Sequence, residues 1–174
     1  MTHSLWLPVG ITTDLFSNLA QTATEQVCFL FSGESAADNI LRVVEIYAVP
    51  PGEFERQSLY HVALADGVRG RVIARATQIG GSLIEVHTHP DGDPASFSHS
   101  DLSGLEEWVP HVRWRLRGRP YVALVFAEET FDGLVWDNGV DEPKQLGELI
   151  LERTGSRSPT GITSRLLSGG RRDR

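Results

Sequence analysis

Two histidines and an aspartate lie close together in the segment from residue 85 to residue 101, which reads EVHTHPDGDPASFSHSD. His87 and His89 are two residues apart at the end of a predicted strand, so their side chains share one face and can share a metal ion. A catalytic zinc site usually has three protein ligands and a fourth position for water. Asp101, near the start of the next predicted helix, is the natural third ligand, although two ordinary surface histidines would show the same spacing.

The spacing within this segment is similar to a known motif. The letters HTHP at residues 87 to 90 are followed by seven residues, Ser98, two further residues and Asp101. This pattern resembles the motif of the JAMM or MPN-type zinc metallopeptidases at each of its fixed positions. That family also has a glutamate far upstream, before a buried strand, and Glu25 precedes the apolar run at residues 27 to 31 in the same way.

The resemblance implies a role for each motif residue. It implies that one zinc ion per chain is bound by His87, His89 and Asp101. It further implies that Glu25 acts as the acid and base on the attacking water, and that Ser98 helps to stabilise the tetrahedral oxyanion. A proton transfer of this kind is typically worth about two to four decades of rate.

The resemblance, which covers about residues 12 to 137, also implies a fold and a reaction. The fold class is α/β, a single layered domain with a mixed, curved sheet flanked by helices, similar in architecture to cytidine deaminases. The implied reaction is hydrolysis of the bond after the C-terminus of a ubiquitin-like modifier, either from a conjugate or from a precursor. The compact form is typical of bacterial relatives, whose partners include activating and conjugating enzymes, in some cases in antiviral pathways.

Several alternatives remain open at this stage. Glu85 shares a strand face with both histidines and competes with Glu25 for the role of base, although orienting an imidazole or lining the substrate groove suits it better. A catalytically silent scaffold of the same fold and a peptidase that processes sulfur-carrier proteins are the rival functions. A zinc deaminase is excluded, because that chemistry needs a set of thiolates and Cys28 is the single cysteine.

The hydrophobic pattern predicts the elements that position these residues. Alternating or continuous apolar runs predict strands at residues 4–9, 27–31, 40–49, 59–63, 82–89, 121–127 and 134–136. Helical spacing and capping residues predict helices at residues 12–19, 66–79 and from a cap at Ser98 or Ser100 toward Pro110. Residues 144–152 fit either type. Arg113, Arg115 and Arg117 alternate with apolar residues, which favours a solvated strand or loop face.

Length and composition predict one metallopeptidase domain at residues 1–152 followed by a tail. The tail, residues 153–174, is rich in arginine, glycine and serine, which predicts a flexible segment anchored at most by Leu166 and Leu167. The formal net charge of -7 argues against nucleic acid as a partner. A lone cysteine and the lack of a long apolar run predict a cytoplasmic protein that does not contact a membrane.

Overall fold

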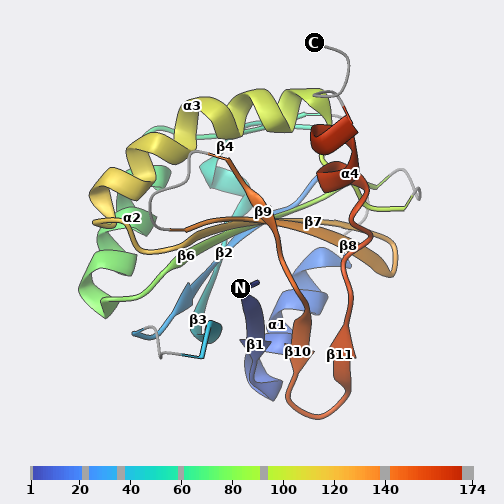
Figure 1. Cartoon of the computed structure of the whole chain (residues 1–174). Helices are drawn as coiled ribbons and strands as arrows, with labels where there is room; N and C mark the ends of the chain where they lie inside the picture. Colours follow the sequence, from blue (N-terminus) through green and yellow to red (C-terminus); the bar gives the residue numbers. More distant parts are fainter. Residues whose placement is uncertain are drawn as a thin grey trace.

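The computed structural model describes residues 2–20, 24–34, 38–58, 61–90, 94–137 and 142–169. These residues form an α/β domain around a curled, mixed sheet of nine strands in the order β11-β10-β1-β3-β2-β6-β7-β8-β9 (Figure 1). The strands of that sheet are β1 (Ser4–Leu7), β2 (Val27–Ser32), β3 (Ile40–Ala48), β6 (Leu83–Thr88), β7 (Tyr121–Ala127), β8 (Thr130–Trp136), β9 (Lys144–Gln145), β10 (Leu149–Leu151) and β11 (Gly155–Arg157).

Helices cover both faces of the sheet, because its central strands are apolar on both sides. Helix α1 (Val9–Leu19) lies against one face, whereas α2 (Val68–Ile79) and α3 (His99–Arg115) lie against the other (Figure 1). The side of α2 and α3 also carries a 3-10 turn, η1 (Pro51–Glu53), and the two-stranded sheet of β4 (Phe54–Gln57) and β5 (Val62–Leu64). The predicted layered α/β class is therefore confirmed.

The predicted elements are found with shifted ends. The strand predicted at residues 59–63 is observed as β5, while residues 59 and 60 lie outside the described residues. Strand β4 was missed, because its sequence FERQ has no apolar alternation. The undecided segment 144–152 forms β9 and β10, and the strand predicted at 134–136 begins four residues earlier, at Thr130, as β8.

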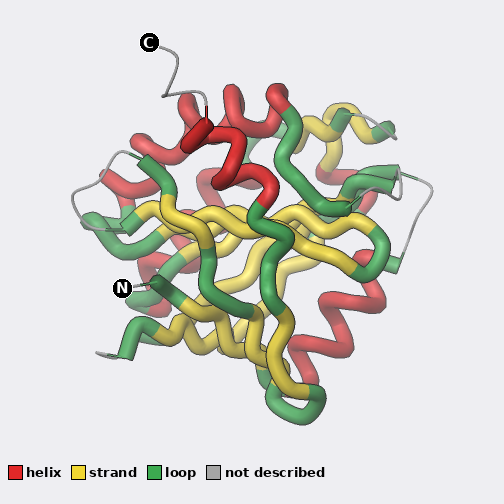
Figure 2. Tube along the Cα trace, turned by 45° about the vertical axis from the view of Figure 1, so that its right-hand side comes forward, coloured by secondary structure: helices red, strands yellow, loops and turns green. Residues whose placement is uncertain are grey.

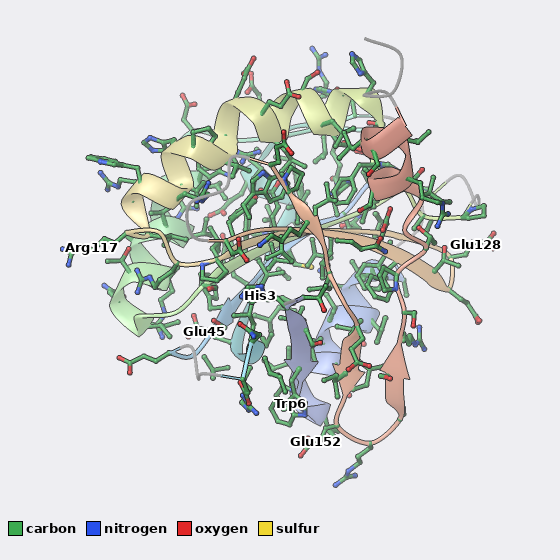
Figure 3. All side chains as sticks on the ribbon, in the orientation of Figure 1. His3, Trp6, Glu45, Arg117, Glu128 and Glu152 are labelled. Atoms are coloured by element: carbon green, nitrogen blue, oxygen red, sulfur yellow. The ribbon has the colours of Figure 1, made fainter. Side chains whose placement is uncertain are left out.

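Helix α3 continues through Pro110 and ends at Arg115, so the strand or loop predicted at Arg113 and Arg115 was wrong, whereas exposed Arg117 lies in the turn that follows the helix. Val112 and Leu116 are buried on the inner side of this final stretch, whereas the ring of Trp114 is 74% exposed. The alternating pattern of arginine and apolar residues is only about one helical turn long. Over so short a stretch it does not distinguish a helix from a strand. Figure 3 shows Arg117 at the end of α3 that is farthest from α4, pointing away from the sheet.

The described part of the tail that was predicted from residue 153 forms regular secondary structure. Strand β11 pairs with β10, and the chain then forms α4 (Ile162–Gly169), which lies beside the start of α3 (Figures 1 and 2). Thr163, which is fully buried, anchors the segment, whereas Leu166 is 65% exposed. Hydrogen bonds rather than apolar burial hold it, and composition gives no signal of them.

No helix among the described residues is long and apolar enough to cross a membrane.

Two glycines between α2 and β6 fix the point at which the histidine-bearing strand begins. Gly80 ends α2 with a positive φ of 77°, which favours glycine. At Gly81 a Cβ atom would lie 1.7 Å from the carbonyl oxygen of Ser32. The backbone N–H of Ser32 donates to the carbonyl of Ser82 at 3.1 Å next to it. The close approach of the end of β2 to the start of β6 therefore requires glycine.

We predict that Gly81→Ala lowers the free energy of unfolding by about 3 kcal/mol, because the added methyl group overlaps backbone that cannot move without breaking the β2–β6 pairing. Gly70→Ala is the matched control. Gly70 lies in α2 with nothing within 4 Å of its Cβ position, so the same substitution there raises stability by about 0.5–1 kcal/mol. Urea denaturation of both variants measures the difference, and equal effects would contradict the steric argument.

Candidate metal centre

The two histidines lie where the sequence predicts, on one face at the end of β6. His87 is inside the strand, paired with Val27 of β2 on one side and Val125 of β7 on the other. His89 follows the strand, and its backbone N–H donates to the carbonyl of Phe126 at 2.8 Å, which keeps the chain extended. The imidazole rings lie 5.0 Å apart between their centroids.

Asp101 reaches both imidazoles from the first turn of α3. Its Oδ2 atom lies 3.5 Å from Nε2 of His87 and 3.2 Å from Nε2 of His89. Ser98 caps the helix: its Oγ accepts the N–H of Asp101 at 3.1 Å, and its own N–H donates to Asp101 Oδ2 at 2.7 Å. This capping box fixes the carboxylate that faces the histidines.

The three side chains fit a bound metal ion. One ligand atom from each of His87, His89 and Asp101 lies within 4.8 Å of the other two. In tetrahedral zinc sites with bonds of about 2.0–2.1 Å, two ligand atoms are about 3.4 Å apart, close to the separations from Asp101. In addition, Nε2 of His87 is buried and makes no hydrogen bond with the described residues. A metal ion would satisfy that atom.

The electrostatic environment keeps Asp101 ionised. Burial raises the pKa of its carboxyl, but the imidazoles of His87 and His89 and the hydrogen bond from Ser98 lower it, and together they prevail. The net effect is a pKa well below the ordinary value for aspartate. The group therefore offers one carboxylate and two imidazole nitrogens, a donor set that suits zinc and other first-row divalent metals.

Glu25 lies outside β2 but close to the cluster. Thr88 donates its N–H to the carbonyl of Gln26 at 3.1 Å, and Gln26 donates its N–H to Oγ1 of Thr88 at 2.8 Å, so the β2–β6 register continues beyond Val27. Counting one residue further places Glu25 opposite His89, on the face of the histidines. Glu25 is buried, with 6% exposure, and lines the same cavity as His87 and Asp101.

The cavity at the cluster has a volume of about 220 Å³ and lies between β6, α2 and α3. The structure thus brings all five predicted site residues to one place: His87, His89 and Asp101 form the cluster, and Glu25 and Ser98 line the cavity beside it. Glu85 also lines the cavity. Its carboxylate faces Tyr121 and Arg69 rather than an imidazole.

The folded tail holds the loop that leads to Ser98, a feature that the sequence analysis missed. Oγ1 of Thr163 accepts the N–H of Phe97 at 3.0 Å, and Oγ1 of Thr160 donates to the carbonyl of Ala95 at 2.6 Å. The ring of Phe97 packs against His87, with 5.7 Å between ring centroids. The tail therefore fixes the backbone immediately before the capping box.

A buried carboxylate fixes the tail in turn. Asp132 of β8 is fully buried and accepts the N–H groups of Gly161 and Thr163 at 3.2 and 3.0 Å. A signal for this contact is present in the sequence, since a lone aspartate interrupts the apolar run FDGLVW of β8. Such a residue needs buried hydrogen-bond donors.

Comparison with known proteins gives a likeness at the level of the fold. No family model matches the chain, and no curated protein matches it. Among solved structures, the solution structure of protein DSY2949 from Desulfitobacterium hafniense is similar, with a TM-score of 0.53 and 18% sequence identity. The match covers 85% of this chain and 92% of that chain. At this identity the likeness supports the layered α/β fold alone.

We predict that Thr163→Val weakens metal binding about 10-fold to 100-fold, as the loss of an outer hydrogen bond at a metal site typically does. The substitution keeps the shape of the side chain but leaves the N–H of Phe97 without an acceptor. Thr163→Ser keeps the hydroxyl and is expected to bind metal as the wild type does. Competition titrations with a chelator measure the affinity, and hydrogen exchange at Phe97 reports the loop directly. Equal affinities for the two variants would refute the coupling.

Proposed function

We propose that this protein is a zinc metallopeptidase of the JAMM or MPN type, which hydrolyses the bond after the C-terminus of a ubiquitin-like modifier. The observation that carries the proposal is the convergence of Nε2 of His87, Nε2 of His89 and Oδ2 of Asp101. The presence of Glu25 and Ser98 at the cavity beside them supports it further. The cytoplasmic location and the bacterial conjugation pathway belong to the same proposal.

In this mechanism His87, His89 and Asp101 hold the metal. Zinc, when bound, lowers the pKa of a water molecule to about 7 and polarises the carbonyl of the bond to be cut. The carboxylate of Glu25 takes a proton from the attacking water and gives it to the leaving amine. One water is consumed: its oxygen joins the carbonyl carbon, and its two protons end on the amine and on the acid.

Ser98 has a second role besides the helix cap. Its Oγ accepts the N–H of Asp101, and this bond does not use the proton of the hydroxyl. That proton can be donated to the oxyanion that forms when water adds to the carbonyl. A donor of this type contributes up to about 3–4 kcal/mol to the transition state. The cap and the oxyanion contact are compatible, because they use different sites on one oxygen atom.

The first experiment measures zinc per chain in protein purified without chelator, by elemental mass spectrometry. We expect close to one zinc per wild-type chain and its loss in the double variant His87→Ala, His89→Ala. His99→Ala is a suitable control, since this histidine lies beside the site on α3 but outside the cluster. Wild-type protein without zinc would contradict the proposal and favour a silent scaffold that binds a partner.

The second experiment tests the base. We predict that Glu25→Gln keeps its zinc but loses about two to four decades of kcat on ubiquitin-like fusions and conjugates, because the amide cannot accept the proton. Glu55→Gln makes the same change at an exposed position of β4 and should leave kcat unaltered. Unchanged activity in Glu25→Gln, with zinc still bound, would rule out this residue as the base while leaving the metal centre intact.

A further inference from the structure

A guanidinium group lies in the cavity next to the metal centre. Arg69, in the first turn of α2, lines the cavity together with the cluster residues His87 and Asp101. It is the single arginine or lysine among the residues that line this cavity, whereas three carboxylates line it. Besides the proposed metal ion, Arg69 is therefore the favourable place in the cavity for an anionic group of a ligand.

Contacts on two sides hold the Arg69 guanidinium in a defined position. Its Cζ lies 4.4 Å from the centroid of the Trp108 ring, so the group stacks on an aromatic face of α3. Its Nη1 donates to Oε2 of Glu85 at 3.4 Å. Glu85 in turn accepts a hydrogen bond of 2.6 Å from the hydroxyl of the buried Tyr121. These contacts fix the plane of the guanidinium.

The remaining donors of Arg69 are available to a ligand. Within the part of the chain that the structure describes, Glu85 is the acceptor found for this side chain, through Nη1. A guanidinium has five N–H donors in a planar fork that matches the two oxygens of a carboxylate. About two fifths of the side chain stays exposed, 41%. Arg69 therefore has both the access and the geometry to bind a carboxylate.

Because Arg69 is hydrogen-bonded to Glu85, the spacing along β6 gives an estimate of how far such a carboxylate lies from the reacting bond. Glu85 and His87 are two residues apart on the same face of the strand, which corresponds to about 7 Å. An extended peptide also covers about 7 Å in two residues. The cavity volume of about 220 Å³ is smaller than the roughly 300 Å³ of the smallest drug-sized pockets. It suits a fragment of one or two residues, but not a folded protein.

We propose that Arg69 binds the free C-terminal carboxylate of a one-residue or two-residue segment that follows the cut bond. This inference rests on the proposed function and makes it more specific: short C-terminal extensions of a modifier are preferred over isopeptide conjugates. In an isopeptide the leaving amine belongs to a lysine side chain of a folded protein, which brings no terminal carboxylate within this distance. Amide hydrolysis releases the short segment as an amine, and its carboxylate remains unchanged throughout.

The kinetic test compares two peptides that differ only at the end, Gly-Gly-Ala-Ala with a free carboxylate and the same peptide with a carboxamide. We expect the zinc-loaded wild type to prefer the carboxylate at least 10-fold in kcat/KM, the size expected for a charge-assisted hydrogen bond. Arg69→Gln should remove this preference by raising KM for the acid alone, and Arg69→Lys should restore part of it. Arg71→Gln, on the same helix but paired with Glu53 outside the cavity, should keep the preference.

A binding test separates this inference from the proposed function. Titration of metal-free protein with the dipeptide Ala-Ala, as free acid and as amide, is followed by nuclear magnetic resonance and needs no hydrolysis. If the wild type binds the acid and Arg69→Gln does not, the carboxylate subsite is supported. If the wild type at the same time hydrolyses neither peptide, the proposed peptidase activity is overturned. Hydrolysis with equal rates for acid and amide overturns the subsite and leaves the peptidase standing. If Arg69→Gln lowers kcat/KM equally for both peptides, Arg69 only holds α2 against α3 and does not bind the carboxylate.

Discussion

A single carboxylate oxygen, Oδ2 of Asp101, connects the start of α3 to the two histidines of β6. It accepts the N–H of Ser98 at 2.7 Å and faces both Nε2 atoms at 3.2 to 3.5 Å. The helix cap and the candidate metal cluster therefore depend on the same atom. A shift of the first turn of α3 by one residue would remove the cap and the candidate third ligand together. The low pKa of this carboxyl keeps the shared oxygen charged.

The other elements mainly limit the movement of the start of α3 and of strand β6, which carry Asp101 and the two histidines. His87 lies on a strand that is paired on both sides, by β2 and by β7, and such central strands open least readily. The described part of the loop before α3, residues 94–98, lies outside the strands of the sheet. Thr163 and Thr160 supply it with hydrogen bonds from a segment more than sixty residues later in the chain. Asp132 then joins that segment to β8, so that the loop is tied to the sheet.

The sequence predicts the parts of this arrangement that follow a local period. Two histidines two residues apart on a strand must share a face, and Ser98 three residues before Asp101 is a recognisable cap. Continuous apolar runs such as β7 are found where they were predicted. The folded tail was missed because single hydroxyl and carboxylate contacts over long distances have no period. The length of α3 was missed because a proline usually ends a helix, whereas exposed Pro110 is tolerated here.

Glu25 and Glu85, the two candidate bases in the cavity, differ in their contacts. Glu85 accepts hydrogen bonds from the hydroxyl of Tyr121 and from an N–H of Arg69, both at its Oε2 atom. Burial and the nearby Glu85 raise the pKa of Tyr121, so that this tyrosine remains a donor. A carboxylate oxygen that already accepts two hydrogen bonds is poorly placed to act on a water molecule at the cluster. Glu25 lies opposite His89 in the extended β2–β6 register. Its position next to the candidate metal ligands, together with its deeper burial, makes it the better candidate for the base in the proposed mechanism.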